Sequence, residues 1–294
     1  MPIAPADYEF IRELVRSRSG ITLEAGKEYL VETRLLPLSR NEGLASISEL
    51  VARLRAGPGA TPLLRKVIEA MTTNETSFFR DIHPFEALRD HILPELLQAR
   101  SATKTLSIWC AAASSGQEPY TIAIVLREHF PQLFNTGWRL QFIATDINAE
   151  MIRRCREGRY SQLEVNRGLP ANLLVKYFRK HGMEWQVDES IRRMIDFREL
   201  NLCDEWATLA APGSLDLVFM RNVLIYFTLE TKRQILGKVR RLLKPDGYLF
   251  LGGAETTINV DDSYQRIQIA KTGIYRPVAA ANAQPFARRL EQAA

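Results

Sequence analysis

The strongest indication of the fold is the stretch Leu106-Ser107-Ile108-Trp109-Cys110-Ala111-Ala112-Ala113-Ser114-Ser115-Gly116-Gln117-Glu118-Pro119-Tyr120, in which an apolar strand runs into a turn of small residues that opens a helix. Between Ala111 and Gly116 the side chains have almost no bulk, so a ligand can lie against the backbone. The helix that follows would direct its N-terminal N–H groups at that ligand. The stretch favours a cradle for a nucleotide-like molecule, but a plain strand-to-helix junction has the same pattern.

A second apolar strand ends in an acid, Asp146, and an acid at this place in a βαβ unit usually holds ribose hydroxyls. We expect strands at Leu106–Cys110, Leu140–Thr145, Ile195–Leu200, Leu215–Met220 and Tyr248–Leu251, with helices at Met151–Glu157 and Leu229–Leu243. Lys244–Gly247 is expected to be a turn between the last helix and its strand. The alternation predicts an α/β protein with a parallel, doubly wound, Rossmann-like sheet, whose ligand lies at the carboxyl ends of the strands.

The remaining segments flank or interrupt this sheet. Residues 1–75 carry apolar residues at helical spacing between Gly and Pro breaks, so we expect a small all-α domain there. Another amphipathic helix is expected at Phe85–Leu97, and the α/β domain would span residues 76–278. Within it, residues 177–198 alternate apolar and polar and predict a small antiparallel β insertion. Residues 279–294 are alanine-rich and are expected to form a flexible tail.

Composition excludes several classes of protein. The 294 residues are 46% hydrophobic and 25% charged, as in an ordinary globular protein with room for two domains. No apolar run is long enough to span a bilayer and the N-terminal residues lack the basic, apolar and small-residue pattern of a leader, so we expect a cytoplasmic protein without direct membrane insertion. Cys110, Cys155 and Cys203 are too scattered for disulfides or a zinc cluster and are expected to be buried. The four histidines lack metal-site spacing, so we expect no metal.

The distribution of charge bears on the partner. The net charge is +5, but residues 1–75 hold ten basic and ten acidic side chains. Nucleic-acid binding normally needs a clustered basic face, so we expect no nucleic-acid partner. Local basic patches could still suit an acidic protein surface.

Three further segments carry polar residues in suggestive places. Met71–Asp81, a polar run leading to two phenylalanines and Arg80, could be a ligand segment; alternatively Thr73 or Asn74 caps a helix and the phenylalanines are core. Met220–Phe227 ends a buried strand in Arg-Asn and continues to Tyr226; this pair would lie at the ligand crevice, or it would close the sheet edge as an ion pair. Asn201-Leu202 follows the strand before it.

Together and in this order, these segments resemble the CheR family of chemotaxis receptor glutamate methyltransferases. The matching text is TTNETSFFRD, WCAAASSGQEPY, ATDI, FMRNVLIYF and LLKPDGYLFLGGAE, and the resemblance spans about residues 8–276. It implies S-adenosylmethionine as methyl donor, S-adenosylhomocysteine as product, and glutamate side chains of methyl-accepting chemotaxis receptors as acceptors. The modified receptor would carry glutamate methyl esters, which serve in signal adaptation. The partner would be the cytoplasmic signalling domain of such a receptor.

The family pattern also implies site residues. Those expected to contact the cofactor are Asn74, Thr76, Arg80, Glu118, Asp146, Asn201, Leu202, Arg221 and Asn222. The residue types agree in part: Asp146 suits ribose hydroxyls, Glu118 suits the cationic amino-acid end, and Asn201 with Leu202 offers adenine a polar edge and an apolar face. As catalytic residues we expect Arg80, which would steer the acceptor carboxylate, and Tyr226, which would orient the acceptor or the methyl group.

The chemistry accounts for the lack of an obvious catalytic base. A glutamate has an ordinary pKa of about 4.3, so the acceptor is already ionised at neutral pH. The donor is a sulfonium and is activated by its own charge. What remains for the protein is to align acceptor oxygen, methyl carbon and sulfur, and to exclude water.

Two departures from the family pattern concern the receptor. The insertion around His181-Gly182-Met183 is short and lacks a glycine-rich loop, so we expect recognition of receptors without a C-terminal tether peptide. The second helix carries only Lys27, Arg34 and Arg40, so docking through that face is less assured. We expect a monomer.

Two other functions remain open: a methyltransferase of RNA or a small molecule, and a non-catalytic S-adenosylmethionine-binding scaffold. The neutral N-terminal part argues against an RNA acceptor. The presence of Arg80, Asp146, Arg221, Asn222 and Tyr226 argues against the scaffold.

Overall fold

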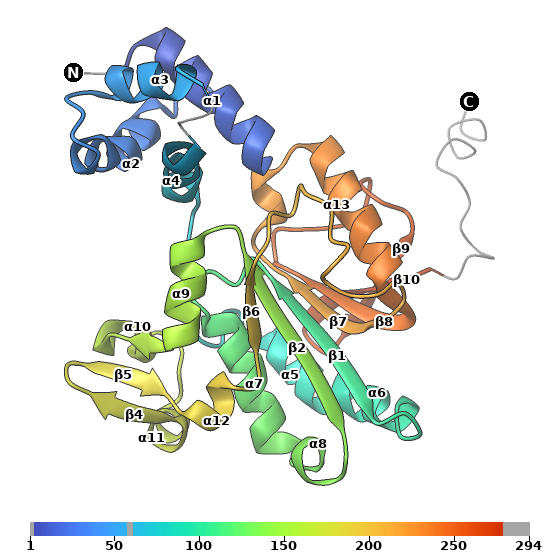
Figure 1. Ribbon diagram of the computed structural model, residues 1–294. Coiled ribbons are helices and arrows are strands. Elements are labelled where there is room, and N and C mark those ends of the chain that lie inside the picture. The colour runs from blue at the N-terminus through green and yellow to red at the C-terminus, as the bar shows by residue number, and fades with distance from the viewer. Residues whose placement is uncertain (1–2, 58–60, 279–294) are drawn as a thin grey trace, which may run out of the picture.

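The computed structural model describes residues 3–57 and 61–278, so the expected tail lies outside the described residues. The N-terminal part consists of helices α1 (Pro5–Ser19), α2 (Glu28–Asn41), α3 (Ile47–Arg55) and α4 (Thr61–Met71), which together lie above the carboxyl ends of the sheet (Figure 1). Their apolar stripes share one core, which includes Ile11, Val31, Leu50 and Met71. The expected all-α part is therefore confirmed.

The main sheet has seven strands in the order β6-β2-β1-β7-β8-β10-β9. Their bounds are β1 (Thr105–Ala111), β2 (Arg139–Asp146), β6 (Asp196–Glu199), β7 (Leu215–Met220), β8 (Leu243–Leu251), β9 (Tyr264–Ile269) and β10 (Thr272–Pro277). β10 runs antiparallel to both neighbours, and the strands from β6 to β8 pair in parallel. All six residues of β7 are buried, as expected for a strand covered on both faces. The predicted doubly wound sheet is confirmed.

Helices cover both faces of this sheet. One face packs against α5 (His83–Ala87), a π-helical turn (Leu88–Ile92), α6 (Leu93–Ala99), α7 (Gln117–His129) and α9 (Ala149–Glu157). The other packs against α13 (Leu229–Leu242). Alternate residues of β1 serve the two sides, with Ile108 in one core and Trp109 in the other. The short helix α8 (Gln132–Asn135) precedes β2.

A small antiparallel sheet projects below α9, in the order β3-β5-β4 (Figure 1). Its strands are β3 (Arg159–Tyr160), β4 (Phe178–His181) and β5 (Glu184–Val187), and helices α10 (Gln162–Asn166), α11 (Ala171–Tyr177) and α12 (Glu189–Arg192) surround them. The predicted antiparallel insertion is confirmed, although β3 lies outside the expected range.

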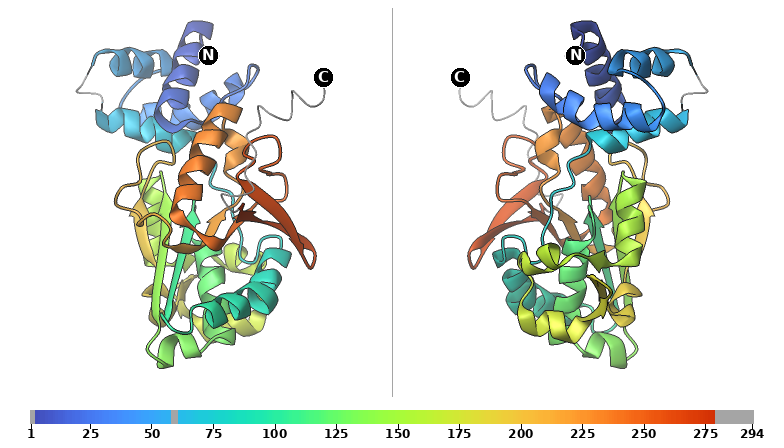
Figure 2. Two further views of the ribbon diagram at one scale, coloured as in Figure 1. Left: turned by 90° about the vertical axis from the view of Figure 1, so that its right-hand side faces the viewer. Right: turned by 90° about the vertical axis from the view of Figure 1, so that its left-hand side faces the viewer.

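Two details at the C-terminal side differ from the sequence prediction. The β9–β10 hairpin at the edge of the sheet (Figure 2) was not expected. The expected strand Tyr248–Leu251 was too short, because β8 already begins at Leu243. Leu215 pairs with Leu243 and Leu217 with Tyr248, so Lys244–Gly247 forms an irregularity within the strand.

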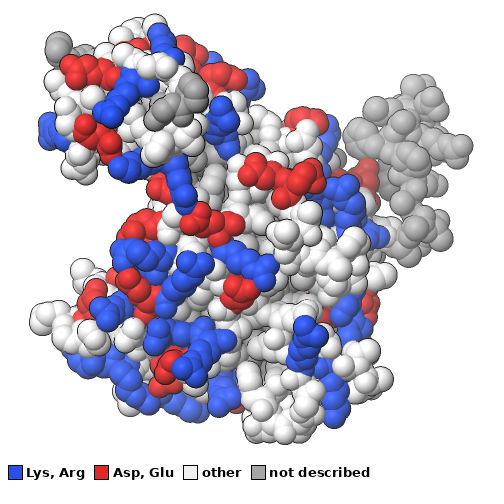
Figure 3. Space-filling model, viewed as in Figure 1, with Lys and Arg blue, Asp and Glu red and all other residues white. Residues whose placement is uncertain are grey.

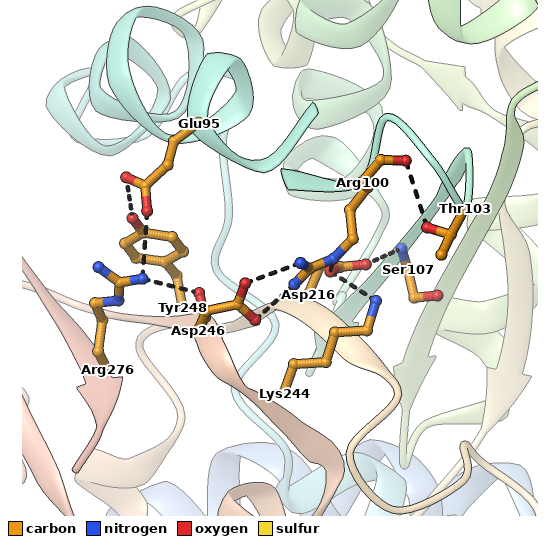
Figure 4. A network of polar contacts seen from close by, with 9 residues as sticks. All are labelled: Glu95, Arg100, Thr103, Ser107, Asp216, Lys244, Asp246, Tyr248 and Arg276. Carbon is orange, nitrogen blue, oxygen red and sulfur yellow. Dashed lines mark hydrogen bonds and ion pairs between the residues drawn. The ribbon is translucent and has the colours of Figure 1, made fainter. Parts of the chain in front are cut away.

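At the amino ends of the strands, a polar network joins α6 to the sheet (Figure 4). Asp216 is fully buried and accepts hydrogen bonds from Ser107 N at 2.8 Å, Arg100 Nε at 2.7 Å and Lys244 Nζ at 2.8 Å. The Arg100 guanidinium also donates two bonds to Asp246. Hydrogen bonds and ion pairs thus offset the cost of burying the Asp216 charge.

Candidate active site

A pocket opens at the carboxyl ends of β1, β2 and β7, beneath the helical domain. It holds about 840 Å³ of space between protein atoms, part of which is open solvent. All ten predicted site residues line it: Asn74, Thr76, Arg80, Glu118, Asp146, Asn201, Leu202, Arg221, Asn222 and Tyr226. The structure thus brings together residues from five separate segments of the chain.

The small-residue turn is held in an unusual backbone conformation. Ala112, Ser114 and Gly116 all have left-handed φ values, of 54°, 52° and 98°. A Cβ at Gly116 would lie 2.9 Å from the Tyr160 hydroxyl and 3.1 Å from Cys155 Sγ, so a side chain there would be strained and crowded. Tyr160 Oη and Cys155 Sγ donate to the carbonyls of Ser115 and Ser114 from behind. Packing outside the pocket therefore fixes the cradle.

Asp146 lies at the end of β2 with only 6% of its surface exposed. Its two carboxylate oxygens accept from the backbone N–H groups of Ser114 at 2.8 Å and Asn148 at 2.9 Å. Burial raises the pKa of this carboxyl, and the amide hydrogen bonds partly oppose that effect. Each oxygen retains acceptor capacity on the pocket side, which suits a pair of ligand hydroxyls.

Two of the predicted site residues bind each other. Arg221 Nη1 donates to Glu118 Oε2 at 2.5 Å, and Nη2 donates to the carbonyl of Arg80 at 2.9 Å and to Asp81 Oδ2 at 3.0 Å. Arg221 Nε is buried without a hydrogen-bond partner in the part of the chain that the structure describes. The ion pair foreseen as an alternative exists, but β7 is an inner strand, so it does not close a sheet edge.

Three more of the predicted residues, Arg80, Asn201 and Tyr226, are partly buried and make hydrogen bonds with other segments of the chain. Arg80 is partly exposed and donates to the carbonyl of Glu75 at 2.9 Å. Asn201 Nδ2 donates to the carbonyl of Arg18 at 2.8 Å, which links the segment after β6 to α1. Tyr226 is half-buried in a 3₁₀ turn (Leu224–Tyr226), and its carbonyl accepts from Thr22 N at 2.9 Å.

Sequence reasoning missed the residue that shapes the loop after β7. The Glu255 carboxylate accepts from the backbone N–H groups of Gly252, Asn222, Val223, Leu224 and Ile225. It holds Asn222 in a left-handed conformation and caps the turn that carries Tyr226. The signal available was the acid that ends LFLGGAE, which follows the last parallel strand.

Sequence reasoning also missed a wall that comes from the helical domain. Ser19 and Ile21 line the pocket, and Ile21 forms an antiparallel bridge with Phe227. Gly20 ends α1 with a φ of 75°, and a Cβ there would lie 2.5 Å from Cys203 Sγ. From α2, Arg34 donates to the carbonyls of Met71 and Thr72, which lead into the pocket segment.

Three minor predictions need correction. Neither Thr73 nor Asn74 caps a helix, because α4 ends at Met71 and α5 begins only at His83. Of the two phenylalanines, Phe78 is fully buried, whereas Phe79 is only partly so. Cys203 is exposed rather than buried, while Cys110 and Cys155 are buried as expected. The burial of Phe79 and Cys203 depends on tertiary contacts, which a local pattern does not report.

The fold and the pocket define a class: doubly wound α/β proteins that bind a nucleoside-containing cofactor at the carboxyl ends of the strands. Within that class the chain belongs to the CheR methyltransferase family. The family model of the SAM binding domain matches residues 74–273, and that of the all-alpha domain matches residues 6–72.

Curated relatives agree over nearly the whole chain. Chemotaxis protein methyltransferase 1 of Pseudomonas aeruginosa is 43% identical over 94% of this chain and 99% of its own length. Chemotaxis protein methyltransferase Cher2 of Pseudomonas putida is 40% identical over 92% and 97%. Among solved structures, a putative S-adenosylmethionine-dependent methyltransferase of Methanococcus maripaludis has a TM-score of 0.37 at 11% identity, covering 73% of this chain and 99% of its own.

The protein is accordingly an S-adenosylmethionine-dependent methyltransferase of chemotaxis. The donor set fits this cofactor: an acid with free lone pairs for ribose hydroxyls, a second carboxylate for an ammonium group, and an apolar side chain beside a polar one for a base. No helix in the described ranges is long and apolar enough to cross a membrane. Nor do the described residues include a group of three or more His, Cys, Asp or Glu placed to hold a metal ion.

Proposed function

We propose that the protein methylates glutamate side chains in the cytoplasmic signalling domains of chemoreceptors and forms glutamate methyl esters. The observation that carries this proposal is the convergence of nine family-pattern residues and Tyr226 on one pocket that offers no strong base. An acceptor that is already ionised needs no base, which favours a carboxylate over a hydroxyl or amine.

In this proposed function, each pocket residue would contact a particular part of the cofactor. Asp146 would accept from the ribose hydroxyls, and Leu202 with Asn201 would flank the adenine. Glu118 would face the cationic amino-acid end, with Arg221 holding its carboxylate in place at 2.5 Å. Asn74, Thr76 and Asn222 would complete the cofactor contacts from the rim.

The chain's own residues then have to position the acceptor. Arg80 is partly exposed and reaches the pocket, so its guanidinium would steer the acceptor carboxylate toward the methyl group. The Tyr226 hydroxyl would orient the acceptor oxygen, on a loop that Glu255 holds rigid. When bound, the cofactor would supply a methyl group on a positively charged sulfur, and the pocket walls would limit the access of water to the weak nucleophile.

The domain limits and the receptor type belong to the same proposal. We place the helical domain at residues 1–75 and the methyltransferase domain at 76–278.

The receptors would lack a C-terminal tether peptide, because only Gly182 and Met183 separate β4 from β5. A tether peptide that bound with micromolar affinity would contradict this. On the face drawn in Figure 3, both signs of charge mix over the helical domain, so docking there would rest on local patches.

The test is to incubate the protein with methyl-labelled S-adenosylmethionine and membranes that contain chemoreceptors from its own cell, and then to treat the labelled protein with mild alkali. Label released as methanol establishes a carboxyl methyl ester. Alkali-stable label, or label on RNA or a small molecule, establishes another acceptor. Measurable cofactor binding without any label in receptor-containing membranes favours the scaffold alternative.

Two variants test the assigned roles in the same assay. Tyr226→Phe and Arg80→Ala should lower turnover while thermal stability stays close to that of the parent protein. Affinity for S-adenosylhomocysteine should be unchanged in Tyr226→Phe and weaker in Arg80→Ala, because Arg80 is also expected to contact the cofactor. Tyr248→Phe and Arg139→Ala are matched controls at the amino end of the sheet, and should keep full turnover. If Tyr226→Phe and Arg80→Ala also kept it, the role assignment would be wrong.

A further inference from the structure

A second groove lies on the other side of Arg221 from the cofactor pocket. Its walls are the segment before α5, with Asp81 and His83, the loop after β8, with Gly253 and Glu255, and the β9–β10 hairpin, with Arg266 and Lys271. Arg221 lines both hollows, so the groove and the pocket share a wall. A polypeptide that delivers a side chain to the cofactor pocket can therefore place neighbouring residues over this groove.

The hairpin presents Arg266 to the groove in a defined way. Arg266 pairs directly with Tyr275 across β9 and β10, so the two side chains leave the hairpin on the same face. Gly273 also lies on that face, and a Cβ there would collide with the Arg266 guanidinium. Tyr275 and Gly273 both line the groove. The absence of a side chain at Gly273 thus lets the guanidinium lie against the backbone.

Some charged side chains of the groove have hydrogen-bond or ion-pair partners, and others do not. Asp81 is paired with Arg221, Glu255 accepts from five backbone amides, and His83 is paired with Glu86. Arg266 and Lys271, in contrast, form no side-chain hydrogen bond or ion pair with any residue that the structure describes. The groove therefore offers two unpaired cations beside the site of methyl transfer.

Resting on the proposed function, we propose that this groove binds an acidic side chain of the receptor segment close to the glutamate that is methylated. Arg266 and Lys271 would recognise that carboxylate while the acceptor glutamate enters the cofactor pocket. The hairpin would then select glutamates by the charge of their neighbours. An acidic side chain fits because Arg266 provides a planar fork that binds a carboxylate through two parallel bonds, and Lys271 adds a second positive charge.

The experiment compares the full-length protein with Arg266→Glu, Lys271→Glu and a matched control, Arg139→Glu, at the opposite end of the sheet. Initial rates of alkali-labile methylation are measured against receptor concentration in membranes, at low and at high salt. Binding of S-adenosylhomocysteine is measured by calorimetry. We expect Arg266→Glu and Lys271→Glu each to raise the KM for receptor about fivefold at low salt, with a smaller difference at high salt. Cofactor affinity and the Arg139→Glu control should match the parent.

The outcomes separate this inference from the proposed function. If the parent protein forms no alkali-labile ester on any receptor, the proposed function fails and the inference fails with it. If the parent methylates receptors and both hairpin variants behave like Arg139→Glu, only the groove assignment is wrong. A loss of S-adenosylhomocysteine affinity in the hairpin variants would also overturn it, because the hairpin would then support the cofactor pocket. Inhibition by free glutamate, at equal ionic strength, that Arg266→Glu abolishes would support carboxylate binding.

Discussion

The two ends of the main sheet both bury a carboxylate, but they treat it differently. At the amino end, Asp216 receives two cationic side chains and a backbone amide, so its acceptor capacity is largely used within the protein (Figure 4). At the carboxyl end, Asp146 receives backbone amides and no cationic side chain among the described residues, and it faces a pocket. A buried carboxylate that stabilises the fold has most of its lone pairs occupied by donors from the protein. A carboxylate that binds a ligand keeps some lone pairs free to accept hydrogen bonds from it.

Backbone strain follows the same division. Of the eight non-glycine residues with positive φ that the structure describes, five lie in loops at the pocket or beside it: Phe79, Asp81, Ala112, Ser114 and Asn222. Such conformations cost about 1–3 kcal/mol each and persist only where surrounding contacts hold them. The amino end shows one nearby case, Lys104. Strain is therefore concentrated where the ligand binds.

The largest effect is expected from Asp216→Ala. Among the described residues, removing this carboxylate takes away the ion-pair partner of Lys244 and leaves Arg100 with Asp246 alone, so the free energy of unfolding should fall by about 3–5 kcal/mol. Urea unfolding measures it, and calorimetry should show unchanged affinity for S-adenosylhomocysteine. Asp246→Ala is the control, because its half-exposed carboxylate should cost less. Equal losses in the two variants would contradict a special role for the buried acid.

Asp146→Ala should have the opposite profile. Affinity for S-adenosylhomocysteine should fall about 100-fold, since hydrogen bonds to a charged group contribute about 1.5–3 kcal/mol each. The free energy of unfolding should fall by only about 1–3 kcal/mol, from the two amides left without an acceptor. Calorimetry and urea unfolding of the same preparation check both. A variant that lost stability but kept affinity would reverse the assignment of the two ends.

Glu255→Gln should have a smaller effect, mainly on turnover. The glutamine side chain has one acceptor oxygen in place of two, and its NH₂ group would face backbone N–H donors, so the loop carrying Tyr226 should shift. We expect kcat to fall about tenfold through misplacement of the acceptor, and cofactor affinity to fall less, through the shift of Asn222. Steady-state kinetics with receptor membranes measure this. Glu230→Gln, on the exposed first turn of α13, is the matched control and should retain full activity.

The smallest expected effect is on the pH dependence of stability. The contributions of Asp246, at the amino end, and Asp146, at the carboxyl end, should change with pH in opposite directions. Hydrogen bonds from Arg100 lower the pKa of Asp246, so its contribution to stability is present above its ordinary value of 3.8 and is lost as pH falls through the lower folded value. Burial raises the pKa of Asp146, so its contribution becomes less favourable as pH rises from 3.8 to the higher folded value. Thermal unfolding against pH for Asp246→Asn and Asp146→Ala measures this. Parallel shifts in both variants would contradict it.

Sequence periodicity predicted the inner strands because they are buried on both faces and read as continuous apolar runs. It missed the β9–β10 hairpin because β9 is an edge strand whose polar residues, among them Gln265 and Arg266, face solvent. All ten candidate site residues came to line one pocket, since strand ends of a parallel sheet meet at one edge. The hydrogen bonds of Glu255 to the loop after β7, and the part of the pocket wall made by Ser19 and Ile21, depend on contacts between distant segments. No local sequence pattern encodes such contacts.

The bridge between Ile21 and Phe227 constrains how this protein could be recombined with others. Because the end of α1 supplies part of the pocket lining, the helical half and the sheet half are not interchangeable modules. A chimaera that joined this sheet to a foreign helical half would need a glycine at the α1 terminus, facing Cys203, and a residue able to pair with Phe227. Exchange at the linear boundary alone would leave the cofactor cavity open on one side.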